Sequence, residues 1–531
     1  MSDGVPIARF DGGGCCGSSS SAAGASDGAD DGRAGASDGD DRKRKRPWQE
    51  EGFRCPFLDT INRMVLDFDF EKACSVTGNN FNVYACLVCG KYFQGRGKHT
   101  QAYTHSLQEG HHVYMNLSDG RVYCLPDGYE VVDASLHDIQ NMLNPSFERE
   151  KIATLDTVPV YARGVDGSDY MPGLIGLNNI KNTDFVNVVV QSLARVPPLR
   201  DFFLLPSNYE RYQRSALVRE FGALVRKMWS PYAARNSLRR NFRRRNSAVQ
   251  FSETPPHHRS SRYNFKGQVS PHELLQACMH ASGSRYRIGV QSDPMDFLAW
   301  LLNALHTALG GTKAAGSSII HTTFQGTVEV TTRSAAAAAA FDEAQAAGEA
   351  PPPEAAGDTK TVPFLYLTVD VPAAPLFKDA LERNIIPQVP LVSCLTKFDG
   401  TSFQEMMNGD RRQYVITKLP KYLVVHIKRF SKNTQQFVEK NPTIVNFPVR
   451  NLEMGPYARL ADGEREKGTK YHLMCSTQHD GPPEGGTYRT FVHFKSNDQW
   501  YEVQDLHVNN VHPQLISVSE SYIQFYDAAQ S

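Results

Sequence analysis

The chain lacks the features that mark several classes of protein. None of its apolar runs reaches the roughly 18 residues that a membrane-spanning helix needs, and its start lacks the basic and then apolar order of a signal peptide. Ten cysteines in 531 residues are too few for a disulfide scaffold. The 57 basic and 57 acidic residues cancel, so the net charge gives no overall attraction to nucleic acid or to a membrane surface. These absences predict a soluble intracellular protein.

Large apolar side chains are nearly missing from residues 1–50, which consist mainly of Gly, Ser, Ala and Asp. Such a segment cannot bury enough surface to offset the entropy of ordering it, so we expect a disordered tail. The tail ends in five consecutive cations and a proline, residues 42–47. A solvated charge run is one interpretation of these cations. A flexible basic strip also suits a nuclear import carrier, and we favour import and a nuclear location.

Composition changes along the rest of the chain indicate two folded domains. Dense aromatic, Cys and His residues over 51–150 indicate a small first domain, followed by a linker over 151–170. Helical and then strand patterns predict an α+β domain over 171–527. Two low-complexity stretches interrupt this domain, 230–264 with eight arginines and one acid, and 334–358 with six consecutive alanines. We expect both to be surface insertions, because a structureless loop of this length does not fit inside a core.

The first domain contains a pattern typical of zinc sites. Cys86 and Cys89 form a Cys-x-x-Cys pair that brings two thiolates to one tight turn, and His105 and His111 follow after fifteen residues. This ligand set and spacing suit one tetrahedral zinc ion. Four protein ligands leave no open coordination position, so the zinc is predicted to be structural.

Other residues of this domain leave alternatives open. His99 lies in a Gly and Lys loop and is expected to face solvent, while His112 directly follows a predicted ligand and is expected to point away from it. Cys55, Cys74 and Cys124 are more readily explained as small buried side chains than as ligands of a second metal ion.

A resemblance supports the zinc prediction. Residues 84–96, together with the regions of His105 and His111, resemble the ubiquitin-protease-type zinc finger. The resemblance implies a small zinc-binding α/β domain. Some members of that family clasp the free C-terminal glycines of ubiquitin and others do not bind ubiquitin, so ubiquitin binding by this finger is left open.

The larger domain opens with a second resemblance. Residues 176–187 resemble the cysteine box of ubiquitin-specific proteases, whose fold is papain-like. Asp184 stands where the family has its nucleophilic cysteine, Lys181 replaces a glycine, and Asn179 matches the asparagine that stabilises the oxyanion. Apolar residues at helical spacing predict a helix that begins in this box.

Two further boxes follow in the order of the same family. Residues 291–298 resemble a scaffold helix, and residues 471–505 resemble the histidine box. Thr487 occupies the position of the general-base histidine, and Gln504, next to Asp505, occupies the third triad position. The Cys pairs that hold a second zinc in many active members are absent, which predicts no metal in this domain. Two strand patterns also match family strands: 364–369 and 422–430.

The three substitutions remove the chemistry of the family's reaction. Thiol proteolysis needs a thiolate, an imidazole that activates it, and a third group that orients the imidazole. A threonine hydroxyl is not a base near neutral pH, and loss of triad members typically costs about a millionfold in turnover. Asp184 instead suits a helix N-terminus, where a carboxylate accepts backbone N–H bonds and contributes roughly 0.5–2 kcal/mol. No replacement triad is indicated for the other histidines and cysteines considered: His472, His479, His493, Cys278, Cys394 and Cys475.

The combination of this finger with a protease-like domain that lacks its triad resembles the U4/U6.U5 tri-snRNP-associated, ubiquitin-specific-protease-like family, over roughly residues 50–527. The resemblance implies a nuclear, non-enzymatic factor with spliceosomal partners that supports tri-snRNP assembly and pre-mRNA splicing. The alternative is a ubiquitin-directed module, either a non-hydrolysing binder or a residual deubiquitinase. For the arginine-rich insertion, a solvated loop is slightly favoured over a site for RNA or an acidic partner.

Overall fold

The computed structural model describes residues 54–69, 71–163, 169–231, 268–347, 352, 356–372, 387–406, 408–432, 438–460 and 468–529. The tail 1–50 and most of the arginine-rich stretch 230–264 lie outside the described residues. The chain divides into two compact units. The smaller unit contains the described residues 54–61 and 74–134, and the larger unit contains the others, including the segment 62–73, which lies between the two parts of the smaller unit in the sequence.

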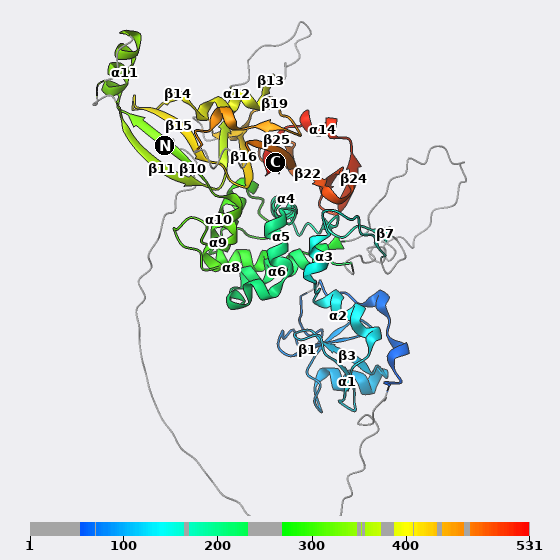
Figure 1. Ribbon diagram of the computed structural model, residues 1–531. Coiled ribbons are helices and arrows are strands. Elements are labelled where there is room, and N and C mark those ends of the chain that lie inside the picture. Colours follow the sequence, from blue (N-terminus) through cyan, green and yellow to red (C-terminus); the bar gives the residue numbers. More distant parts are fainter. Residues whose placement is uncertain are drawn as a thin grey trace, which may run out of the picture. The chain divides into compact units, whose positions relative to one another are not determined.

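The smaller unit is an antiparallel sheet with one helix (Figure 1). The strands lie in the order β2-β1-β3-β4-β5. Helix α1 ends at Gly110, whose φ of 64° is a left-handed conformation that glycine adopts without strain. One core cluster of this unit is small and largely aromatic, and a unit of this size buries limited apolar surface. Its elements are β1 (Val83–Cys86), β2 (Tyr92–Gln94), α1 (Gln101–Glu109), β3 (Val113–Asn116), β4 (Val122–Cys124) and β5 (Glu130–Val131).

The larger unit combines a group of helices with two larger sheets and several short strand pairs, so the predicted α+β class is confirmed (Figure 1). Most of its helices precede its sheets in the chain. The helices are α2 (His137–Leu143), α3 (Arg149–Ala153), α4 (Asp184–Leu193), α5 (Pro197–Leu204), α6 (Ala216–Trp229), α8 (His272–Ala281), α9 (Pro294–Ala308), α10 (Ile319–Phe324), α11 (Ala335–Ala347), α12 (Leu391–Leu395) and α14 (Pro513–Ser517).

The main sheet of this unit has the strand order β12-β16-β25-β21-β22-β23-β24, and β20 pairs with β21. All its pairs are antiparallel except β12 with β16. Its strands are β12 (Leu367–Asp370), β16 (Tyr422–Lys428), β20 (Leu452–Glu453), β21 (Lys470–Asp480), β22 (Thr487–Phe494), β23 (Gln499–Gln504), β24 (His507–Val511) and β25 (Ser521–Ala528).

A second sheet has four antiparallel strands in the order β11-β10-β15-β14. These strands are β10 (Gly326–Arg333), β11 (Asp358–Phe364), β14 (Asp399–Glu405) and β15 (Arg411–Lys418). The short pairs are β6 (Ala162–Arg163) with β7 (Asp169–Tyr170), β8 (Gly176–Leu177) with β9 (Gln268–Val269), β13 (Gln388–Pro390) with β19 (Ile444–Asn446), and β17 (Phe430–Lys432) with β18 (Val438–Lys440).

Helix α4 lies at the centre of this unit. All ten of its residues are buried, and it packs against strand β22 and helix α9. The start of α9 is fixed by Asp293, whose carboxylate accepts the Met295 N–H at 2.6 Å, and by Pro294 in the first turn. The predicted helix after the cysteine box is therefore confirmed, and the helix predicted over 291–298 is confirmed from Pro294 onward.

Several expected boundaries look different in the structure. Part of the expected linker 151–170 belongs to α3, and Ile152 lies in the main core. Half of the expected insertion 334–358 forms α11. The strand pattern over 364–369 is divided, because β11 ends at Phe364 and β12 begins at Leu367 in a different sheet. None of the helices in the described part of the chain combines the length and apolarity that a bilayer crossing requires.

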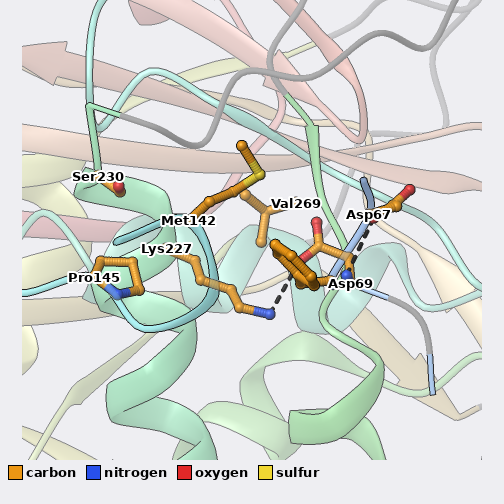
Figure 2. A pocket seen from close by; sticks show the side chains of 8 residues that line it. Asp67, Asp69, Met142, Pro145, Lys227, Ser230 and Val269 are labelled. Atoms are coloured by element: carbon orange, nitrogen blue, oxygen red, sulfur yellow. Dashed lines mark hydrogen bonds and ion pairs between the residues drawn. The ribbon is translucent and has the colours of Figure 1, made fainter. Parts of the chain in front are cut away.

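The segment 62–73, which we call the strap, is an integral part of the larger unit. Its side chains Leu66 and Phe68 are buried, and the Asp69 carboxylate lies 2.9 Å from Lys227 Nζ on α6. Figure 2 shows this ion pair beside a cavity of about 20 Å³, which is room for about one water molecule. The strap thus adds both apolar and charged contacts to the helices.

Candidate functional site

The smaller unit brings the four predicted zinc ligands together. Cys86 ends β1, Cys89 follows in the next turn, His105 lies on α1, and His111 precedes β3. One ligand atom from each residue lies within 4.8 Å of all the others. Among the residues that the structure describes, this is the one group of three or more Cys, His, Asp or Glu side chains placed to hold a metal ion.

The distances in this group fit a tetrahedral zinc ion. Cys86 Sγ lies 3.5 Å from His111 Nδ1, and Cys89 Sγ lies 3.4 Å from His105 Nε2. The two histidine nitrogens are 3.1 Å apart. Zinc bonds of about 2.3 Å to sulfur and about 2.0 Å to nitrogen place tetrahedral ligands about 3.5 Å apart for a sulfur and a nitrogen, and about 3.3 Å for two nitrogens. The side chains are therefore arranged for the ion without rearrangement.

The alternative ligands lie elsewhere. His99 is exposed and has a φ of 68°, and the Nδ1 of His112 lies 2.8 Å from the carbonyl of Leu125, away from the cluster. Cys55, Cys74 and Cys124 are buried. The hydroxyl of Tyr129 donates to Cys55 Sγ at 3.3 Å, so this thiol has a buried polar contact of its own.

In the larger unit, Asp184 occupies a closed position at the start of α4. Its side chain is 2% exposed. The two carboxylate oxygens accept hydrogen bonds from Gln291 Nε2 at 3.1 and 2.9 Å, and one of them also accepts the Tyr488 N–H at 2.9 Å. Burial raises the pKa of Asp184, while these donors lower it. Gln291 Nε2 also donates to the Gly486 carbonyl at 2.9 Å, so the site links α4, the segment before α9, and β22.

The asparagine that matches the family's oxyanion position has another partner here. Asn179 Nδ2 donates to the Asp505 carboxylate at 3.0 Å, and Asn187 Nδ2 donates to its other oxygen at 2.8 Å. The chain also approaches closely at Gly176, where an added Cβ would lie 2.6 Å from the backbone of Leu506. The amide of Asn179 is therefore engaged in a structural network with a carboxylate.

Thr487 and Gln504, the residues that the sequence resemblance places at the other two triad positions, are neither acids nor bases. Thr487 is exposed, and its hydroxyl accepts a long hydrogen bond of 3.4 Å from Gln504 Nε2. Neither side chain has a proton that moves readily near neutral pH. The three positions thus give a carboxylate, a hydroxyl and an amide in place of a thiol, an imidazole and a third orienting group.

Three cysteines and His479, which were candidates for a replacement triad, are buried in the structure. Burial raises the pKa of Cys475 to about 12 and raises the pKa values of Cys278 and Cys394, so these thiols resist forming the thiolate that attacks. The buried imidazole of His479 lies beside Tyr488, and burial lowers its pKa to about 4. No described hydrogen bond joins any of these thiols to a histidine ring.

Two residues of the site were not recognised from the sequence. Gln291 was interpreted as part of a scaffold helix, and Asp505 only as a neighbour of the third triad position. Their roles depend on contacts across 107 and more than 300 residues of chain. A local sequence pattern does not encode such contacts. The polar amide of Gln291, next to a buried helix, was nevertheless a signal that this side chain has a polar partner.

Two family models match the chain. The model described as ubiquitin carboxyl-terminal hydrolase matches residues 175–526, and the model described as Zn-finger in ubiquitin-hydrolases and other protein matches residues 74–136. The first match covers most of the chain. The chain belongs to the ubiquitin carboxyl-terminal hydrolase family. Its finger matches that family's zinc finger, which agrees with the Cys and His cluster.

Individual members of the family support the predicted resemblance. The chain is 43% identical to human "Ubiquitin carboxyl-terminal hydrolase 39" over 495 residues, which cover 89% of this chain and 79% of that protein. It is 39% identical to "Probable mRNA-splicing protein ubp10" of Schizosaccharomyces pombe, covering 89% and 88%. The structure titled "Crystal structure of an essential yeast splicing factor" matches with a TM-score of 0.66 at 24% identity, covering 89% and 100%. This last match confirms the fold of the hydrolase family for the chain.

Proposed function

We propose that this member of the hydrolase family is a non-enzymatic splicing factor. The observation that carries the proposal is the buried Asp184 carboxylate, held by three hydrogen bonds at the position of the family's nucleophile. A relative that is 39% identical over 89% of the chain is named as a probable mRNA-splicing protein, which supports the splicing part of the proposal. The fold then serves as an interaction scaffold for the tri-snRNP.

The chemistry of the site supports the absence of hydrolysis. The buried Asp184 carboxylate accepts two hydrogen bonds from Gln291 Nε2 and one from the Tyr488 N–H, which hold it in place. A carboxylate is also a poor nucleophile toward an isopeptide. The position of the base holds Thr487, which does not accept a proton near neutral pH. Because triad members act as a unit, restoring one of them is not expected to restore turnover.

We also propose that one structural zinc ion is held by Cys86, Cys89, His105 and His111. The observed distances support this ligand set, and four protein ligands leave no position for a substrate. In a unit with so small a core, binding of the ion contributes directly to folding. The ion would therefore position the finger's surface, without taking part in a reaction.

Location and partners complete the proposal. The basic run at 42–47, which lies outside the described residues, supports a nuclear location. Spliceosomal proteins are the proposed partners, and the finger and the protease-like domain, expected over 51–150 and 171–527, are the proposed interaction modules. RNA or an acidic protein is a candidate partner of the arginine-rich stretch 230–264, most of which also lies outside the described residues.

Affinity purification from nuclear extract tests the proposal. Tagged full-length protein is expected to recover tri-snRNP proteins and snRNAs at moderate salt, and to restore splicing to an extract from which the endogenous protein has been removed. A matched Asp184→Asn variant, which keeps the shape of the side chain, is expected to do both if no reaction is needed. Recovery of ubiquitin and ubiquitin conjugates without tri-snRNP components would favour the ubiquitin-directed alternative.

A further inference from the structure

The nucleophile position of the larger unit is built like a site for an anion. Gln291 Nε2 donates to both oxygens of the Asp184 carboxylate, and the Tyr488 N–H donates to one of them, all within 3.1 Å. The Phe185 N–H at the start of α4 also favours the charged form of this carboxylate. Side-chain and backbone donors thus converge on one buried point, next to the positive end of a helix.

These donors are held by the rest of the fold. Gln291 Nε2 is also fixed by its hydrogen bond to the Gly486 carbonyl at 2.9 Å. Tyr488 belongs to β22, where it lies opposite His479 of β21 in the main sheet. Removal of the Asp184 side chain would therefore leave the donors in place, in an arrangement that still favours a negative charge.

We propose that this group of donors is a carboxylate-binding site that the protein fills with its own Asp184. The ligand class is a small carboxylate, such as formate, which presents the same two oxygens as the Asp side chain. In the intact chain the Asp184 carboxylate already binds these donors. The C-terminal carboxylate of another protein is therefore not expected to bind there. Occupation of these donors by Asp184 is a separate feature from the absence of a thiol. This inference does not depend on a role in splicing.

The surroundings set how tightly an added anion would bind. Thr487 is exposed and Gln291 is only partly buried, so these two residues form the side of the site that lies nearest to solvent. The charge of Asp505 opposes a second negative charge nearby. Asn179 and Asn187 donate to Asp505 and offset part of this repulsion. We therefore expect a weak site that needs a high concentration of the ligand.

Chemical rescue of an Asp184→Ala variant tests the proposal. The full-length variant is expected to melt at a lower temperature than the wild type in sodium chloride at neutral pH. Replacing the chloride with sodium formate at about 0.3 M should raise its melting temperature by about 2 °C more than that of the wild type. The double variant Asp184→Ala with Gln291→Ala is the matched control, because it lacks the side-chain donor and should lose this formate-specific gain.

Two results would overturn the proposal. One is an equal response to formate in the wild type and in Asp184→Ala, and the other is an equal gain in the single and the double variant. If the single variant does not fold in chloride, the comparison is made on the yield of soluble protein from refolding in each salt. A yield that is the same in formate and in chloride would then reject a carboxylate site.

Discussion

Acid is expected to destabilise the larger unit through His479 on β21. This side chain is 2% exposed, and its ring lies 4.8 Å from the ring of Tyr488 and 5.2 Å from that of Phe430. Burial among these rings lowers the pKa of His479 to about 4, because the charged imidazole loses its hydration. The folded protein therefore keeps this histidine neutral under conditions in which the unfolded chain protonates it.

The sign and size of the effect follow from this difference. The ordinary pKa of a histidine is about 6.5, so its contribution to stability is fully present above that pH and is lost as the pH falls toward about 4. Between pH 7 and pH 5 the expected loss is about 2 kcal/mol. The nearby charge of Lys440 also lowers the pKa of His479, while Asp480 and Glu520 raise it.

Urea denaturation at pH 7 and at pH 5 measures this loss. A His479→Gln variant, which keeps a polar side chain but does not titrate, should lose about 2 kcal/mol less than the wild type between the two pH values. An exposed histidine on β24 provides the matched control, and His507→Gln should behave as the wild type does. An equal loss in the wild type and in His479→Gln would refute the reasoning.

Three further predictions address the metal and the packing. Cys86→Ala should lose the zinc and unfold residues 74–134, which metal analysis and circular dichroism would detect. Cys74 is a buried cysteine outside the cluster, so Cys74→Ala should keep its zinc. Arg200 is 2% exposed and lies 2.6 Å from Asp156, so Arg200→Ala should cost about 3 kcal/mol in urea denaturation, while Arg219→Ala at an exposed pair should cost under about 1 kcal/mol. Gly176→Ala should lower the melting temperature clearly, because its Cβ would overlap the backbone of Leu506, whereas Gly97→Ala, which meets no neighbour, should have little effect on packing.

The sequence predicted the features that local spacing determines. The Cys-x-x-Cys pair and two histidines were enough to define the cluster of Cys86, Cys89, His105 and His111, because a tetrahedral site needs that spacing. The position of Asp184 at a helix start followed from apolar periodicity after the cysteine box. The α+β class followed from the order of helical and strand patterns along the chain.

Features that depend on distant contacts were missed. The strap 62–73 belongs to the larger unit because Asp69 meets Lys227, 158 residues away. The expected linker packs against the larger unit because Ile152 lies in its main core and Asp156 forms an ion pair with Arg200. The helix α11 was not predicted, although a run of alanines has high helix propensity and gave a local signal for it.

The central claim is that the chain keeps a hydrolase fold without the reaction. Release of a fluorophore from the C-terminus of ubiquitin tests it directly, with an active member of the family as the positive control. We predict no release above the buffer blank for the purified full-length protein, and none for Asp184→Cys while Thr487 and Gln504 remain. Steady turnover that scales with the concentration of the wild-type protein and disappears in Asp184→Ala would contradict the claim.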